Sequence, residues 1–178
     1  VLSIGLVLAV ILQRSLRDYQ KNRILVYLNP DLDPKGAGYN VIQAKIAIGS
    51  GGFFGKGYLS GTQTQYGFLP EKTSDFVFPV IAEEWGFFGA FVVILLMFGI
   101  IYQGLKVALE AKDKFSSLLA FGLSSLFLFH AIINIGMVIG LTPVTGIPLC
   151  FVSYGGTNLI MCMIAVGILL SIKMSKSA

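Results

Sequence analysis

The longest uncharged stretch of this chain limits most strongly what it can fold into. No Lys, Arg, Asp or Glu occurs between Phe115 and Ile172. A helix that crosses the hydrocarbon core of a bilayer needs about 20 apolar residues, so this stretch has room for two crossings. Pro143, Gly146 and Pro148 lie in its middle. They predict a break between two helices, because proline and glycine interrupt regular helical structure.

The composition also indicates a membrane protein. Of the 178 residues, 55% are hydrophobic and 12% are charged, and the mean hydropathy is +0.80. Soluble domains carry about 25% charged residues, and a chain with half as many would expose too much apolar surface to stay in solution. The high apolar content also excludes disorder. Cys150 and Cys162 both have apolar neighbours, so neither a disulfide framework nor a metal-ligand spacing is predicted.

These patterns predict an all-α, polytopic membrane bundle with four spans. We place the spans at 1–16, 78–105, 115–139 and 149–172, within a single membrane domain that covers 1–178. The chain begins inside an apolar run and without Met. We therefore expect the C-terminal part of a longer membrane protein, with its first helix cut.

Lysines between the spans predict the orientation. Lys106, Lys112 and Lys114 separate the second and third spans, and Lys173 and Lys176 follow the fourth. Because short cytoplasmic loops are enriched in Lys and Arg, both groups are predicted to face the cytoplasm. The long segment 17–77 then faces outward.

Further cations lie in or beside this outer segment, against the usual rule. Near its start they are Arg14, Arg17, Lys21 and Arg23. Farther along they are Lys45, Lys56 and Lys72. Either the topology is inverted, or these side chains bind an anion such as a lipid headgroup or a pyrophosphate. Taken singly, each of the three later lysines is more often solvated.

The outer segment also contains structure of its own. Tyr39–Gly49 has the apolar spacing of a short interfacial helix or a re-entrant piece. A glycine-rich stretch follows, and its sequence GSGGFFGKG resembles a phosphate loop only superficially. Gly57 follows Lys56 where that loop needs Ser or Thr. We therefore predict no nucleotide binding and no organic cofactor.

Asp75 is the first candidate for chemistry, because it lies where the polar segment becomes the second span. A carboxylate is favoured at the start of a helix. The alternative is that Ser74 or Asp75 only caps the helix. Glu71 is either a second polar ligand or a solvated loop acid.

Glu83 and Glu84 lie about two turns into the same helix and point about 100° apart. At least one must face protein or a water-filled cavity, because charge at bilayer depth is costly. The two acids either form the wall of a site or include a structural ion pair with a cation such as Lys45.

Polar side chains also occur in the last two spans. His130 and Asn134 lie one turn apart and predict a hydrogen bond between helices. Ser153 either faces a cavity or packs, and Gly155 and Gly156 beside it allow another backbone to approach closely.

Several strings along the chain together resemble one family. They are AIGSGG, GKG, FLPE, SDF, AEE, PVTGIPL and SYGG. This combination resembles the SEDS family of RodA, FtsW and SpoVE proteins, over about Tyr19 to Ile172. The GTQ string at Gly61–Gln63 is more similar to the elongation branch, RodA, than to the division branch, FtsW.

The resemblance implies a fold of ten membrane helices, of which this chain would hold the last four. It implies a peptidoglycan glycosyltransferase of the bacterial cytoplasmic membrane that polymerises lipid II at the outer face, for cell elongation and rod shape. Asp75 matches the essential acid of the family, and Gln20 and Thr62 match polar positions of its cavity. The other candidates for substrate binding are Arg17, Arg23, Lys45, Lys56, Glu71, Glu84 and Ser153.

The implied chemistry suits a single carboxylate. Asp75 would take the proton of an attacking sugar hydroxyl, which contributes about 10²–10⁴-fold to the rate, or would hold a divalent cation, Mg or Mn, beside the departing pyrophosphate. The implied partners are lipid II, a class B penicillin-binding protein transpeptidase and membrane proteins of the elongation machinery, with no nucleic acid. The alternatives are a lipid II flippase and a non-catalytic scaffold for a penicillin-binding protein.

Overall fold

The computed structural model describes residues 23, 25–27, 33, 36–69 and 72–177 of the chain. Within these residues the regular structure is helical, and no strand occurs, which confirms the all-α prediction. The helices are α3 (Ala37–Gly51), α4 (Thr62–Gln65), α5 (Val77–Glu110), α6 (Lys114–Ile139) and α7 (Gly156–Ser177). The predicted span 1–16 and the candidates Arg17, Gln20 and Glu71 lie outside the described residues.

Three of the described helices are long and apolar enough to cross a membrane. They are α5, α6 and the Gly156–Ser175 part of α7, and the predicted spans 78–105 and 115–139 fall within the first two. The last helix begins at Gly156 and not at 149 as predicted. Pro143 and Pro148 disfavour helix in the loop before it, because proline restricts its own backbone and that of the residue before it. Residues 150–152 then form a turn, in which Phe151 has a φ of 64°.

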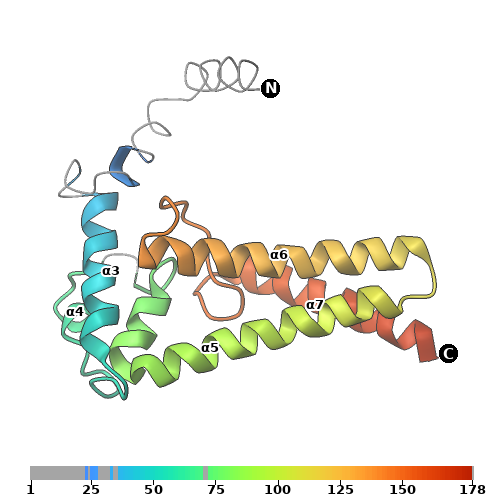
Figure 1. The fold of residues 1–178 in the computed structure, drawn as a ribbon, viewed down its shortest axis with the longest axis horizontal. Helices are drawn as coiled ribbons and strands as arrows, with labels where there is room; N and C mark the ends of the chain where they lie inside the picture. Colours follow the sequence, from blue (N-terminus) through green and yellow to red (C-terminus); the bar gives the residue numbers. More distant parts are fainter. Residues whose placement is uncertain (1–22, 24, 28–32, 34–35, 70–71, 178) are drawn as a thin grey trace, which may run out of the picture.

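The long helices form a bundle with α3 at one end (Figure 1). α5 and α6 run side by side in opposite directions, and α7 packs against both. Their shared core includes Met97, Phe127 and Leu169. A second core joins α3 to the start of α5 and the end of α6, and includes Ala44, Phe78 and Met137.

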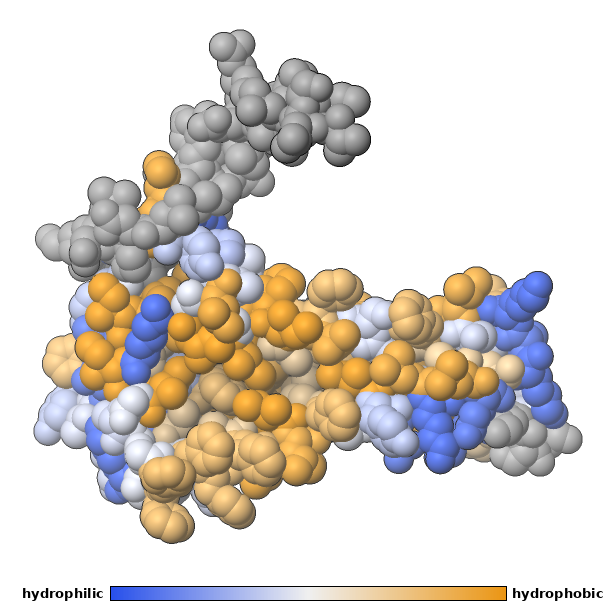
Figure 2. All heavy atoms as spheres, in the orientation of Figure 1, coloured by the Kyte–Doolittle hydropathy of each residue, from blue (hydrophilic) through white to orange (hydrophobic). Residues whose placement is uncertain are grey.

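The surface divides into an apolar body and a charged end. Figure 2 shows hydrophobic side chains over the long helices and hydrophilic ones gathered at the end away from α3. Lys112 and Lys114 lie there in and beside the α5–α6 connection. Asp113 caps α6 there by accepting hydrogen bonds from the Ser116 backbone and hydroxyl, both at 2.8 Å, and these bonds lower the pKa of Asp113.

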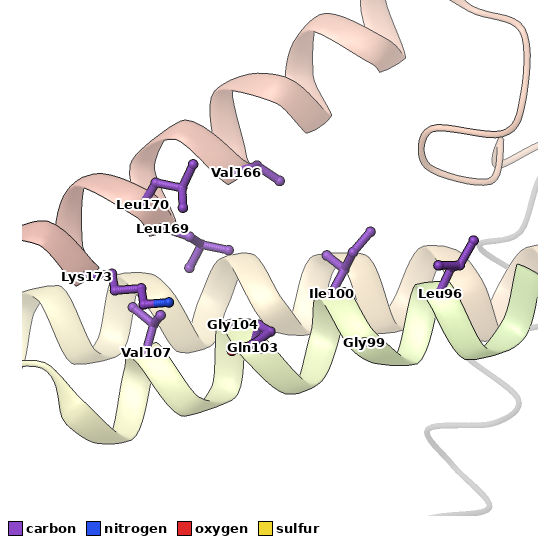
Figure 3. Close-up of a pocket in the computed structure, with 10 residues that line it drawn as sticks. All are labelled: Leu96, Gly99, Ile100, Gln103, Gly104, Val107, Val166, Leu169, Leu170 and Lys173. Carbon is purple, nitrogen blue, oxygen red and sulfur yellow. The ribbon is translucent and has the colours of Figure 1, made fainter.

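A groove of about 360 Å³ opens between α5 and α7 (Figure 3). Gly99 and Gly104 leave room on α5, while Val166 and Leu170 line the α7 side. Lys173 lies at one end of this otherwise apolar groove. The groove follows the second half of α5, away from the end where that helix begins.

Helix α5 is broken near its start. Its 34 residues would span about 51 Å if straight, against about 30 Å of hydrocarbon core. Gly86 interrupts it with φ 68° and ψ −162°, a backbone conformation that is essentially restricted to glycine. The first turns of α5 therefore lean toward α3, and the rest runs beside α6 (Figure 1).

The glycine-rich loop after α3 satisfies the backbone groups that this break releases. The bonds run from Lys56 N to Glu83 O (3.0 Å), Gly57 N to Glu84 O (3.0 Å), Phe87 N to Gly52 O (2.8 Å) and Phe88 N to Phe53 O (3.3 Å). Unpaired backbone groups are costly away from water. The loop therefore completes the helix, and it must approach very closely: a Cβ atom on Gly86 would clash with the backbone of Phe53 and Gly55.

We predict that Gly86→Ala destabilises the full-length protein in detergent by about 2–4 kcal/mol, from backbone strain and the clash with the loop. Gly122→Ala is the matched control, because a Cβ atom there meets nothing within 4 Å in the middle of α6. The control should gain about 1 kcal/mol from helix propensity. Thermal unfolding measures the stability of both variants. Equal unfolding temperatures for the two would contradict the requirement for glycine at the break in α5.

Candidate functional site

Asp75 lies in the turn that leads into α5 and is partly exposed. The N-cap position of α5 belongs to Phe76, which makes no side-chain capping bond. Neither Ser74 nor Asp75 therefore holds the N-cap position itself, and a capping contact from either side chain stays a prediction. The hydrophobic Phe76 and Phe78 side chains are buried in the core that joins α3 to the start of α5, and Asp75 beside them is partly exposed at the α3 end of the bundle.

Helix α6 and the loop between α6 and α7 meet at the segment around Asp75. Nδ2 of Asn134, on α6, donates to Asp75 O at 3.1 Å and to Ile147 O at 2.8 Å. The loop between α6 and α7 also approaches the carboxylate, since a Cβ atom added at Gly146 would lie 3.2 Å from Asp75 Oδ2. Farther along the same loop, Tyr154 N donates to Thr73 O at 2.8 Å. The SDF, PVTGIPL and SYGG strings thus meet at one place.

Two of the predicted cations lie around the end of α6. Arg23 Nη1 donates to Val144 O at 2.7 Å, and Val144 is two residues from Gly146, about 7 Å in extended chain. The ammonium group of Lys45 lies beside Gly140, which ends α6 in a left-handed conformation. A cation is favoured there, because the carbonyl end of a helix is negative.

A second polar cluster surrounds Glu83, whose side chain is fully buried. Lys56 Nζ forms an ion pair with Glu83 Oε1 at 2.8 Å and also donates to Thr62 Oγ1 at 2.8 Å. Thr62 Oγ1 donates to Oε1 at 3.2 Å, and Gln63 N donates to Oε1 at 2.9 Å. Thr64 donates to Oε2 from its backbone at 3.1 Å and from its hydroxyl at 2.9 Å.

The cluster corrects the expected ion pair. Glu83 pairs with Lys56 and not with Lys45, because the loop folds back along the broken helix and brings Lys56 to the carboxylate. Glu84 is also buried, at 7% exposure, and its carbonyl takes part in holding the loop. Lys72 donates to Thr64 O at 3.1 Å. The predicted cations Lys56 and Lys72 and the predicted Thr62 therefore hold the segment between α3 and α5 together. A contact of Lys56, Thr62 or Glu84 with substrate stays a prediction.

Polar residues of the last two helices bind the connecting loop. His130 Nδ1 donates to Pro148 O at 3.2 Å, one turn before Asn134. The predicted hydrogen bonds between helices are thus helix-to-loop bonds. Ser153 is buried, and its hydroxyl accepts a hydrogen bond from Leu149 N at 2.8 Å, which closes a turn. Substrate binding by Ser153 remains a prediction.

Sequence reasoning missed Asn134 and Gly146 as neighbours of Asp75. The available signal was a polar amide inside an apolar span, where such side chains are retained for a partner. Within the described ranges, no three His, Cys, Asp or Glu side chains gather as a metal-binding group.

We predict that Glu83→Gln lowers the free energy of unfolding by about 3 kcal/mol, because the ammonium group of Lys56 then lacks the negative charge with which it pairs. Adding Lys56→Met should cost less than the sum of the two single changes, because the two side chains interact directly. Chemical or thermal unfolding of the full-length protein in detergent measures the free energy of unfolding of each member of this double-mutant cycle.

Asp113→Asn provides the control for that cycle, since it also converts a carboxylate to an amide but keeps a good helix cap. Its stability should match that of the parent. Additive effects of the Glu83 and Lys56 substitutions on the free energy of unfolding would show that these two side chains do not stabilise each other.

Comparisons with known proteins agree with the motifs that meet at Asp75. The family FTSW_RODA_SPOVE, described as "Cell cycle protein", matches residues 1–178. The chain is 46% identical to "Peptidoglycan glycosyltransferase RodA" of Treponema pallidum over 89% of its length, and 48% identical to "Peptidoglycan glycosyltransferase MrdB" of Escherichia coli K12 over 88%. It is 44% identical to "Stage V sporulation protein E" of Bacillus subtilis over 86%.

A solved structure has the same fold. Its TM-score is 0.74 at 31% sequence identity, with 98% of this chain covered, and it is described as "Structural coordination of polymerization and crosslinking by a peptidoglycan synthase complex". The chain spans 37% and 42% of the length of the RodA and MrdB relatives, and 47% of the chain in the solved structure. The match over every residue and the identity to these relatives show that this chain belongs to the FtsW/RodA/SpoVE family.

Proposed function

We propose that this chain is part of a peptidoglycan glycosyltransferase that polymerises lipid II at the outer face of the bacterial cytoplasmic membrane, for cell elongation and rod shape. The names of the RodA and MrdB relatives support the activity. The observation that carries the proposal is the meeting of Asp75 with α6 and the α6–α7 loop at one end of apolar helices. A carboxylate so placed can meet a lipid-linked sugar at the membrane surface.

In the proposed reaction, the Asp75 carboxylate accepts the proton of an acceptor sugar hydroxyl as that oxygen attacks the anomeric carbon of the donor sugar. The bond from this carbon to undecaprenyl pyrophosphate breaks, and the configuration inverts because there is a single displacement. General base catalysis of this kind contributes about 10²–10⁴-fold. Pyrophosphate is a good leaving group, so a second acid is not required.

The departing pyrophosphate needs positive charge. Arg23 is the described cation tied to the loop beside Asp75, through Val144 O. A divalent cation, Mg or Mn, also fits this end, because Mg²⁺ is commonly held by one or two carboxylates together with substrate phosphates. Asp75 would then be its protein ligand, and the ion would neutralise charge on the leaving group.

Exposed aromatic side chains support a position of this end near the membrane surface. Tyr58 and Tyr66, between α3 and α5, and Trp85, beside the break in α5, are between 58% and 74% exposed. Trp and Tyr side chains are enriched at membrane–water interfaces. The lysines at the opposite end of the bundle suit the cytoplasmic side, which supports an outward-facing Asp75.

A class B penicillin-binding protein is the proposed partner, with other membrane proteins of the elongation machinery. The structural relative is described as a complex that coordinates polymerization and crosslinking. A glycan polymerase and a crosslinking transpeptidase act on the same strand, so a direct contact between them would keep the two steps together.

The decisive variant is Asp75→Asn in the full-length protein. We expect a loss of glycan synthesis from purified lipid II of about 10²–10⁴-fold, because the amide can neither take the proton nor supply a charged ligand. Gel analysis of the glycan chains measures the rate. Asp113→Asn, a carboxylate change at the opposite end of α5 and α6, is the control and should keep the parental rate.

Normal polymerisation by Asp75→Asn would remove both roles proposed for this acid. If the parent instead moves labelled lipid II across vesicles and makes no glycan, the protein is a flippase. If the parent neither makes glycan nor moves lipid II, the scaffold function is the one that remains.

Orientation is tested by cysteine labelling in cells. Tyr66→Cys, at a side chain 74% exposed in the segment after α4, should react with an impermeant reagent from outside. Lys112→Cys, in the α5–α6 connection, should react only after the membrane is permeabilised. The opposite pattern would place Asp75 at the cytoplasmic face and exclude the proposed polymerase.

A further inference from the structure

Asn134 makes an unusual pair of contacts at the end of α6. Its side chain is fully buried, and its Nδ2 donates to two carbonyls from distant segments, Asp75 O at 3.1 Å and Ile147 O at 2.8 Å. Both neighbours are acceptors, so the nitrogen must face them. Each of the two N–H groups of the amide can thus serve one carbonyl.

The oxygen of the Asn134 amide shows which contacts decide the orientation of this side chain. Asn134 Oδ1 is buried without a hydrogen-bond partner in the described part of the chain. A buried acceptor without a partner costs free energy. Asn134 adopts this orientation nonetheless, so its two carbonyl contacts set the geometry.

Gly146 borders the same carboxylate from the other side. Its φ is +74°, and a Cβ atom there would lie 3.2 Å from Asp75 Oδ2. Asn134 therefore links the backbone of Asp75 to that of Ile147, the residue after Gly146. Gly146, which has no side chain, leaves the space that the carboxylate occupies. We infer that Asn134 is a positioning residue that, together with Gly146, sets the place from which the Asp75 carboxylate takes a proton from the substrate or holds a cation beside it.

This inference depends on the proposed function of Asp75, and it predicts a specific kinetic pattern. A displaced reacting group loses about 10²-fold in rate for a shift of about 1 Å. Loss of positioning should therefore lower kcat and leave KM nearly unchanged, because Asn134 acts on the carboxylate and not on the bound lipid.

The chain offers a matched control for Asn134. His130 Nδ1 binds Pro148 O in the same loop, one turn earlier on α6, at 3.2 Å. Asn134→Leu and His130→Leu each remove side-chain donation to this loop, and only the first also removes the hydrogen bond to Asp75 O. With full-length protein and purified lipid II, we expect kcat to fall about 10- to 100-fold for Asn134→Leu and to stay near the parental value for His130→Leu.

A second pair of variants tests the inference even if Asn134→Leu does not fold. Gly146→Ala and Gly67→Ala impose similar backbone strain, at φ +74° and +73°, and a Cβ atom at Gly67 meets nothing within 4 Å. The methyl group of Gly146→Ala would press on Asp75 Oδ2. We expect Gly146→Ala to lower kcat at temperatures where thermal unfolding shows both variants folded, and Gly67→Ala to keep the parental kcat.

The outcomes separate this inference from the proposed function. Activity in Asp75→Asn would overturn the function and the positioning role together. An inactive Asp75→Asn with parental kcat in folded Asn134→Leu and Gly146→Ala would overturn the positioning role alone. Equal losses of kcat in Asn134→Leu and His130→Leu would also overturn it, because general loop packing would then explain both.

Discussion

The broken start of α5 is the constraint on which the rest of this end of the molecule depends. Gly86 leaves the carbonyls of Glu83 and Glu84 without helical partners, and the loop after α3 supplies the backbone amides that bind them. In an apolar environment such groups must be paired within the protein. The break therefore fixes the loop, and the loop places Lys56 beside the Glu83 side chain.

Two of the carboxylates at this end, those of Glu83 and Asp75, have different surroundings and suit different work. Glu83 is fully buried and accepts an ion pair and hydrogen bonds from Lys56, Thr62, Gln63 and Thr64. A carboxylate has about four lone-pair sites, so this one is saturated and structural. Asp75 is partly exposed and is held through its backbone, by Asn134. That arrangement fixes the position of a side chain while leaving it at the surface of the bundle.

Much of the fold was predictable because it follows from local sequence. Apolar stretches long enough to cross a bilayer predicted α5 and α6 within a few residues, and the Pro143–Pro148 region predicted a break. The start of α7 was missed by seven residues, since Leu149–Gly155 is apolar enough for a helix. Only the packed structure shows that Ser153 closes a turn there and that Tyr154 binds Thr73.

The sequence by itself determined the helical class, the apolar spans and the presence of an acid at the entrance to one of them, because these depend on hydropathy and residue spacing along the chain. The tertiary structure alone decided which polar groups meet. Lys56 reaches Glu83 across 27 positions, and Asn134 reaches Asp75 across 59. Partners so far apart in sequence are chosen by how the helices pack and where a helix breaks, and buried polar groups then take the donors and acceptors that packing brings to them.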